Sequence, residues 1–132
     1  MSFGASVIPA CASSAAARAA SKFGEVRIVA PDVEQSSMGH AITHGRPLRY
    51  HKTRLPDGFD AYRVNGTPAD CVALGTHHWE KVDLVLSGVN AGQNVADDGT
   101  YSGTSAGAIE GTRRGVSSIA LSEAYTYEGT RK

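Results

Sequence analysis

Short apolar runs along the chain alternate with segments of helical spacing. The runs at residues 26–30, 82–86 and 117–121 are bounded by turn residues, which is typical of buried strands in a parallel sheet. Residues 3–8 predict only a weak strand, because Gly4 lies within the run and a proline ends it. We therefore expect an exposed sheet edge where the first strand of the sheet should lie.

Small residues and capping residues predict two helices between these strands. An alanine-rich helix is expected over residues 13–23, with a serine at its start and Gly24 just past its end. The second helix is expected over residues 102–114 and contains three glycines at intervals of four. These glycines weaken the helix, but they suit close packing of its backbone against a sheet.

Residues 65–72 predict the start of another helix. Thr67 is the expected N-cap, Pro68 the first helical residue and Asp70 an acid of the first turn. Cys71 falls on the apolar face of this helix. We interpret it as a packing residue, since nothing basic is placed to activate its thiol.

The order of the predicted elements indicates the fold class. Residues 48–51 and 61–64 predict a hairpin, joined through a Leu-Pro-Asp-Gly turn at residues 55–58. Elsewhere strands alternate with helices, as in α/β proteins with a mostly parallel sheet. We predict a single three-layer α/β/α Rossmann-like domain over residues 1–132, incomplete at both ends.

Composition and charge narrow the classes of function. The chain carries 13 basic and 13 acidic residues, so no net charge attracts a nucleic-acid polymer or an anionic membrane. Its two cysteines, Cys11 and Cys71, lack the spacing of a disulfide framework or a metal site, and no apolar run is long enough to span a bilayer. We therefore expect a reduced, cytoplasmic setting and no secretory signal.

Candidate chemistry is concentrated between the predicted strand at residues 82–86 and the predicted helix at residues 102–114. A polar loop beside a helix N-terminus is where open α/β sheets place their ligands, and the helix end favours an anion. Ser102 can cap the helix, Gly103 lets a phosphate approach the backbone and Thr104 adds a hydroxyl. A plain N-cap explains Ser102 equally well.

Several oxygen-bearing side chains fall in the same loop: Asn90, Asn94, Asp97 and Asp98. They suit a hard cation such as Mg²⁺ or Mn²⁺, although asparagine is also common in turns and the aspartates could simply hold the loop or cap the helix. The G-x-S-x-G at residues 103–107 does not indicate a serine hydrolase. A polar loop precedes it, and all five histidines lie before the serine.

Several motifs, in unbroken order over about residues 19–122, resemble the SurE family of stationary-phase survival proteins. Residues 1–18 are atypical of that family. The motifs are Val-Ala-Pro-Asp at 29–32 with Ser36, Asn-Gly-Thr-Pro-Ala-Asp-Cys-Val at 65–72, Ser-Gly-Val-Asn-Ala-Gly at 87–92, Asn94, Asp97 with Asp98, Tyr-Ser-Gly-Thr at 101–104, and Glu110 with Gly111.

The resemblance implies a function and a set of site residues. Family members are 5′/3′-nucleotidases, which hydrolyse nucleoside monophosphates through attack by a water that a divalent metal activates. The cofactor implied is Mg²⁺ or Mn²⁺, and a homo-oligomer, dimer or tetramer, is expected. The implied metal ligands are Ser36 and Asn90, and the implied phosphate pocket is lined by Asn94, Ser102, Gly103 and Thr104.

The chain departs from the family pattern at its first strand. The family has Asn-Asp-Asp-Gly there, and its two aspartates are the principal metal ligands. Counted back from Pro31, that pair falls near Ala5 and Ser6, and no acidic residue occurs before Glu25. A site of neutral oxygens should hold a divalent cation weakly. An altered reading frame, a misassigned start or a degenerate copy would each account for this segment.

The leading hypothesis is a metal-dependent phosphatase of the SurE type, which hydrolyses nucleoside 5′- and 3′-monophosphates and is impaired by the absent aspartate pair. Its catalytic residues stay unassigned for that reason. The alternative is a non-catalytic fragment that binds phosphate or a nucleotide, or a subunit that functions only within an oligomer.

Overall fold

The computed structural model describes residues 2–7, 10–32, 41–79, 81–91 and 103–123. These residues form one six-stranded sheet and the helices packed on it. In chain order the elements are β1 (Ser2–Val7), α1 (Ala10–Ser21), β2 (Glu25–Pro31), β3 (Tyr50–Arg54), β4 (Asp60–Val64), α2 (Pro68–His78), β5 (Leu84–Ala91), α4 (Gly103–Arg113) and β6 (Ser117–Glu123).

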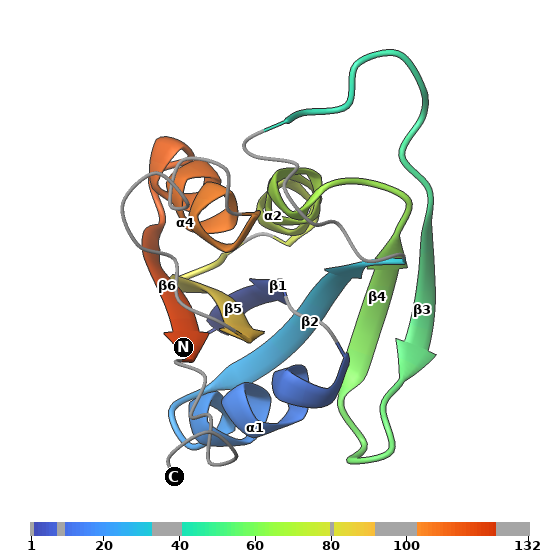
Figure 1. The fold of residues 1–132 in the computed structure, drawn as a ribbon. Coiled ribbons are helices and arrows are strands. Elements are labelled where there is room, and N and C mark those ends of the chain that lie inside the picture. Colours follow the sequence, from blue (N-terminus) through green and yellow to red (C-terminus); the bar gives the residue numbers. More distant parts are fainter. Residues whose placement is uncertain (1, 8–9, 33–40, 80, 92–102, 124–132) are drawn as a thin grey trace, which may run out of the picture.

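The sheet has the strand order β3-β4-β2-β1-β5-β6, and its neighbouring strands are parallel except for the antiparallel pair β3 and β4. Helix α1 covers one face of the sheet, while α2 and α4 lie together on the other (Figure 1). This arrangement confirms the predicted three-layer α/β/α architecture with a mostly parallel sheet. Within the described part of the chain, no helix is both long and apolar enough to cross a membrane.

The expectation of an exposed edge at the first strand is wrong. Strand β1 lies inside the sheet, where Phe3 is opposite Val26 of β2 and Leu84 of β5. Ladder pairing on both sides outweighs the weak propensity of the sequence, because strand propensity depends strongly on context. The register shifts between Phe3 and Ser6, and this irregularity accommodates the glycine between them.

The first helix also differs from its prediction at one end. It begins at Ala10 rather than Ser13, and it ends at Ser21, close to the predicted end. The three additional residues, Ala-Cys-Ala, are compatible with a helix, and alanine has the highest helix propensity of all residues.

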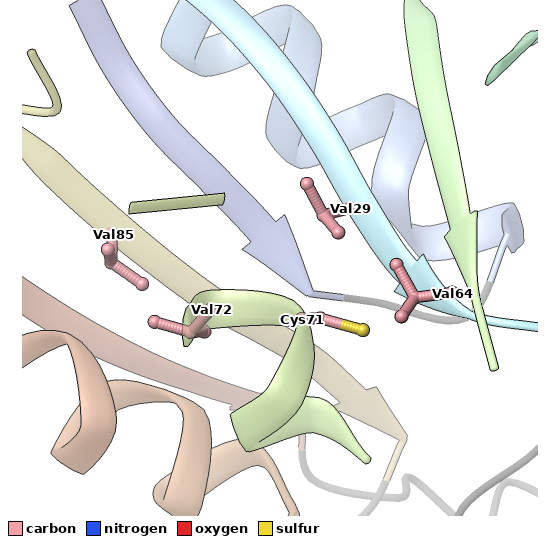
Figure 2. Packing of buried hydrophobic residues seen from close by; sticks show 5 residues of the cluster. All are labelled: Val29, Val64, Cys71, Val72 and Val85. Carbon is pink, nitrogen blue, oxygen red and sulfur yellow. The ribbon is translucent and has the colours of Figure 1, made fainter. Parts of the chain in front are cut away.

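Two apolar clusters hold the layers together. Between the sheet and α2, five buried side chains pack against one another (Figure 2): Val29, Val64, Cys71, Val72 and Val85. On the opposite face, Ala17 of α1 packs with Ile28 and Ala61. Burial raises the pKa of the Cys71 thiol far above its usual range, which fits the prediction that Cys71 is a packing residue and not a nucleophile.

The hairpin of β3 and β4 forms where the turn residues predict it. The backbone N–H of Leu55 donates to the carbonyl of Phe59, and that of Gly58 donates to the carbonyl of Leu55. Gly58 has a φ of +89°, a conformation that favours glycine. Strand β3, over Tyr50–Arg54, begins and ends later than the predicted segment at residues 48–51, and β4, over Asp60–Val64, begins one residue earlier than predicted.

Close packing explains two of the glycines in α4. A Cβ on Gly107 would lie 2.5 Å from Oγ of Ser87 in β5, and a Cβ on Gly111 would meet Oγ of Ser118 in β6. The helix therefore rests directly on the sheet through its backbone, as its sequence predicts.

Candidate active site at the carboxyl edge of the sheet

The connections of the sheet mark the place where a ligand is expected. From β1 the chain passes to β2 and then β4 on one side, whereas β5 and β6 lie on the other side of β1. The direction of the connections therefore reverses between β1 and β5. In open α/β sheets, ligands bind outside the carboxyl ends of the strands at such a switch point.

Two helices begin at this edge and touch there. Gly103 opens α4 so close to α2 that a Cβ on it would lie 2.8 Å from Cγ of Pro68, the first residue of α2. Free N–H groups and the positive end of the helix dipole make a helix N-terminus favourable for an anion. In α2 the capping box occupies part of this donor capacity, so the first turn of α4 is the better candidate.

The structure describes three of the six site residues that the sequence predicts. Gly103 and Thr104 form the start of α4, and Asn90 lies near the end of β5, where its Cα pairs with that of Ser122 in β6. A Cβ on Gly88 would lie 3.1 Å from Cγ2 of Thr104, so the first turn of α4 sits on β5 close to Asn90. The other three, Ser36, Asn94 and Ser102, lie outside the described residues, as do Asp97 and Asp98.

The predicted end of the strand before this site is wrong. The sequence Ser-Gly-Val-Asn was expected to begin the polar loop, but β5 continues through it to Ala91. Pairing with β6 extends the strand, and Gly88, with a φ of +113°, accommodates a shift in register between Ser87 and Asn90. A Cβ on Gly88 would collide with the carbonyl of Leu121, which explains the glycine there.

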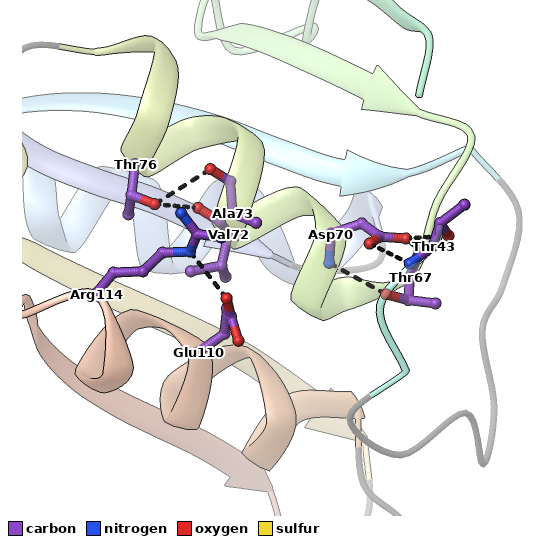
Figure 3. Close-up of polar contacts among 8 residues, drawn as sticks. All are labelled: Thr43, Thr67, Asp70, Val72, Ala73, Thr76, Glu110 and Arg114. Atoms are coloured by element: carbon purple, nitrogen blue, oxygen red, sulfur yellow. Dashed lines mark hydrogen bonds and ion pairs between the residues drawn. The ribbon is translucent and has the colours of Figure 1, made fainter. Parts of the chain in front are cut away.

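A hydrogen-bond network beside the site contains the predicted Thr67 cap and adds an unpredicted contact with Thr43 (Figure 3). The carboxylate of Asp70 accepts from the backbone N–H of Thr43 at 2.9 Å, from the Thr43 hydroxyl at 2.6 Å and from the backbone N–H of Thr67 at 2.9 Å. The Thr67 hydroxyl accepts from the N–H of Asp70 at 3.1 Å and donates to the carbonyl of Ala41 at 2.6 Å. The network therefore ties residues 41–43 to the start of α2.

The electrostatics of Asp70 follow from these contacts. Burial of the side chain, which is 1% exposed, acts to raise the pKa of Asp70, but the hydrogen bonds from Thr43 and Thr67 outweigh it and lower the pKa. Gly66 leaves room for the carboxylate, since a Cβ there would lie 2.7 Å from Oδ2 of Asp70. Asp70 is thus an ionised carboxylate whose two oxygens already accept hydrogen bonds within the fold, so we do not count it as a metal ligand.

The local sequence predicts one part of this network, the Thr67 cap of α2. A threonine followed three residues later by an acid is a recognisable variant of the capping box. The partner Thr43 lies 27 residues away in sequence, and no local pattern indicates that contact.

The described residues do not fit a tightly bound divalent cation. Positions 5 and 6, where the resemblance expects two aspartates, are Ala and Ser within β1 at the centre of the sheet. Among the residues that the structure describes, no three His, Cys, Asp or Glu side chains converge on one point. Hard divalent cations are held chiefly by carboxylate oxygens, and positions 5 and 6 at the end of β1 supply none.

Comparison with known proteins identifies the family. The family described as survival protein SurE matches residues 6–131. The chain belongs to the SurE family. The predicted resemblance is confirmed, and the match begins earlier than the predicted limit near residue 19.

Individual SurE proteins give the same result. The chain is 54% identical over 107 residues to the 5′-nucleotidase SurE of Deinococcus radiodurans, covering 80% of this chain and 40% of that protein. It is 56% identical over 102 residues to the 5′-nucleotidase SurE 1 of Thermus thermophilus, covering 75% of this chain and 40% of that protein. The chain thus spans about 40% of the length of these relatives.

A solved structure supports the fold independently. The crystal structure of the SurE protein from Aquifex aeolicus superimposes with a TM-score of 0.76 at 38% identity. The superposition covers 94% of this chain and 52% of that protein. The sheet and helices described above are therefore those of a SurE protein.

Proposed function

We propose that this chain binds nucleoside monophosphates at the carboxyl edge of its sheet and acts as a phosphatase of the SurE type. One observation carries the proposal: the first turn of α4 and the end of β5 meet at the switch point of the sheet. They do so in a chain about half identical to proteins named 5′-nucleotidase SurE. The reaction is hydrolysis of the phosphate ester at the 5′ or the 3′ position.

The phosphate is assigned to the residues around the start of α4. The backbone at Gly103 lets an anion approach closely, and the hydroxyl of Thr104 offers a further donor. Asn94 and Ser102 complete the pocket that the family resemblance implies. Together these groups would bind and orient the phosphoryl group, whose position relative to the attacking water largely determines the rate of such reactions.

Mg²⁺ or Mn²⁺ is the cofactor that the family implies, with Ser36 and Asn90 as its ligands. Because positions 5 and 6 carry no carboxylate, we expect weak metal binding and impaired hydrolysis. The same feature favours the second candidate function, a non-catalytic phosphate- or nucleotide-binding fragment, or a subunit active only within an oligomer. A homo-oligomer, dimer or tetramer, and a cytoplasmic location are further predictions.

Phosphate release from nucleoside 5′- and 3′-monophosphates with Mn²⁺ or Mg²⁺ tests the proposal, with Asn90→Ala as the inactive comparison. Release above that of Asn90→Ala supports a phosphatase. Release no greater than that of the variant contradicts catalysis by this chain. In that case, calorimetric binding of AMP would support a non-catalytic nucleotide-binding fragment, and absence of binding would contradict a nucleotide site in this chain.

A further inference from the structure

We infer that Asp70 is a positioning residue for the phosphate site, acting through the start of α2 on Gly103. This inference rests on the proposed function, because it concerns the same site. Asp70 itself lies in the first turn of α2, and all its described hydrogen bonds go to Thr43 and Thr67.

The first step of the argument is the fixed position of the α2 N-terminus. One buried carboxylate binds donors from two segments, the Thr67 cap and Thr43, which lies 27 residues earlier in the chain. The Thr67 hydroxyl in turn donates a hydrogen bond to the carbonyl of Ala41. Such a network restrains the helix start from outside the helix, which an ordinary cap does not do.

The second step is the contact between the two helices. Pro68 follows the Thr67 cap directly and is buried, and its ring fills the space where a side chain on Gly103 would lie. The backbone of Gly103 can therefore sit only where Pro68 allows. A displacement of the α2 start would move Gly103 and, with it, the N–H groups that α4 offers to a phosphate.

Substitution of Thr43 tests the positioning role of Asp70 without breaking the Thr67 cap of α2. Thr43→Val removes the hydroxyl donor but keeps the shape, the backbone donor to Asp70 and the whole capping box. Thr43→Ser retains the hydroxyl and serves as the rescue. Thr76→Val is the matched control, because the Thr76 hydroxyl is also partly buried and its bonds among the described residues go to carbonyls of its own helix, at Val72 and Ala73 (Figure 3).

Two measurements are made on each variant of the full chain: amide hydrogen exchange at residues 43 and 67, and calorimetric affinity for AMP. Loss of a hydrogen bond to a charged group predicts about tenfold faster exchange at these amides in Thr43→Val. AMP affinity should fall about three- to tenfold in that variant, with both properties restored in Thr43→Ser and unchanged in Thr76→Val.

The outcomes separate this inference from the proposed function. Faster exchange in Thr43→Val with unchanged AMP affinity would make Asp70 a purely structural residue and overturn the inference. Equal effects in Thr43→Val and Thr76→Val would overturn it as well. If the unmodified chain binds no AMP, the proposed function fails and positioning for a phosphate fails with it, while the exchange data still show whether Asp70 couples the two segments.

Discussion

The Asp70 side chain joins two segments, Thr43 and the start of α2, at the carboxyl edge of the sheet. It is buried, charged and bonded to both Thr43 and Thr67, so each oxygen of the carboxylate has a defined partner. An amide in its place would present N–H groups to donors that need an acceptor. Replacement by Asn is therefore expected to destabilise the fold, since a buried donor left unsatisfied costs free energy.

We predict that Asp70→Asn lowers the free energy of unfolding by roughly 2 kcal/mol at pH 7. The pKa of Asp70 in the folded chain lies below its ordinary value of 3.8, so its stabilisation is complete above about pH 3.8 and is lost as the pH falls through the lowered pKa. In urea unfolding from pH 7 downward, the difference in unfolding free energy between the unmodified chain and Asp70→Asn should stay constant and narrow only below about pH 3.8. If the difference in unfolding free energy between the two proteins already disappears near pH 6, the pKa of Asp70 is not lowered.

At the scale of elements, α4 is defined by how closely it approaches the sheet. Its backbone at Gly107 lies against Ser87 of β5, which is fully buried. Such a contact leaves no space for even a methyl group. Intrinsic helix propensity and packing therefore oppose each other at this position.

Gly107→Ala tests which of the two effects is larger. Alanine favours a helix by about 1 kcal/mol, but the forced displacement of α4 from β5 should give a net destabilisation of about 1–3 kcal/mol in urea unfolding. Gly45→Ala is the control, because a Cβ there meets nothing within 4 Å and its φ is not in the left-handed region. A Gly107→Ala protein as stable as the unmodified chain would show that the helix does not rest on Ser87.

Elements that depend on neighbouring residues could be predicted from the sequence, whereas those that depend on distant contacts could not. The cap at Thr67, the turn at Gly58 and the apolar run of β2 depend on neighbouring residues, and all are found where expected. The interior position of β1 and the extension of β5 depend on pairing with distant strands, so local patterns did not predict them. For the same reason, the start of α4 near Gly103 could be predicted from its local sequence, whereas the contact of Thr43 with Asp70 could not.

For the whole molecule, the central question is how a SurE sheet functions with a changed central strand. Strand β1 occupies the middle of the sheet, and its carboxyl end lies at the switch point beside β5. The fold thus keeps the place where the family resemblance expects two aspartates, but Ala5 and Ser6 occupy those positions. The phosphate site proposed at the start of α4 and the metal position that the resemblance implies at the end of β1 can therefore be tested separately.

Restoring the carboxylates should restore metal affinity. We predict that Ala5→Asp/Ser6→Asp binds Mn²⁺ at least about tenfold more tightly than the unmodified chain, measured by calorimetry without nucleotide. The control is Ala15→Asp/Ala19→Asp, which adds the same charge on the exposed surface of α1. Equal Mn²⁺ affinity in the two double variants would contradict a metal position at the end of β1.

The most direct test of the account is an NMR titration of the unmodified chain with AMP, beside one with adenosine. If the phosphate binds at the start of α4, AMP should shift the amide resonances of Gly103, Thr104 and the end of β5 most strongly, and adenosine should leave them nearly unchanged. Equal shifts with both ligands, or shifts confined to the hairpin of β3 and β4, would contradict a phosphate site at the carboxyl edge of the sheet.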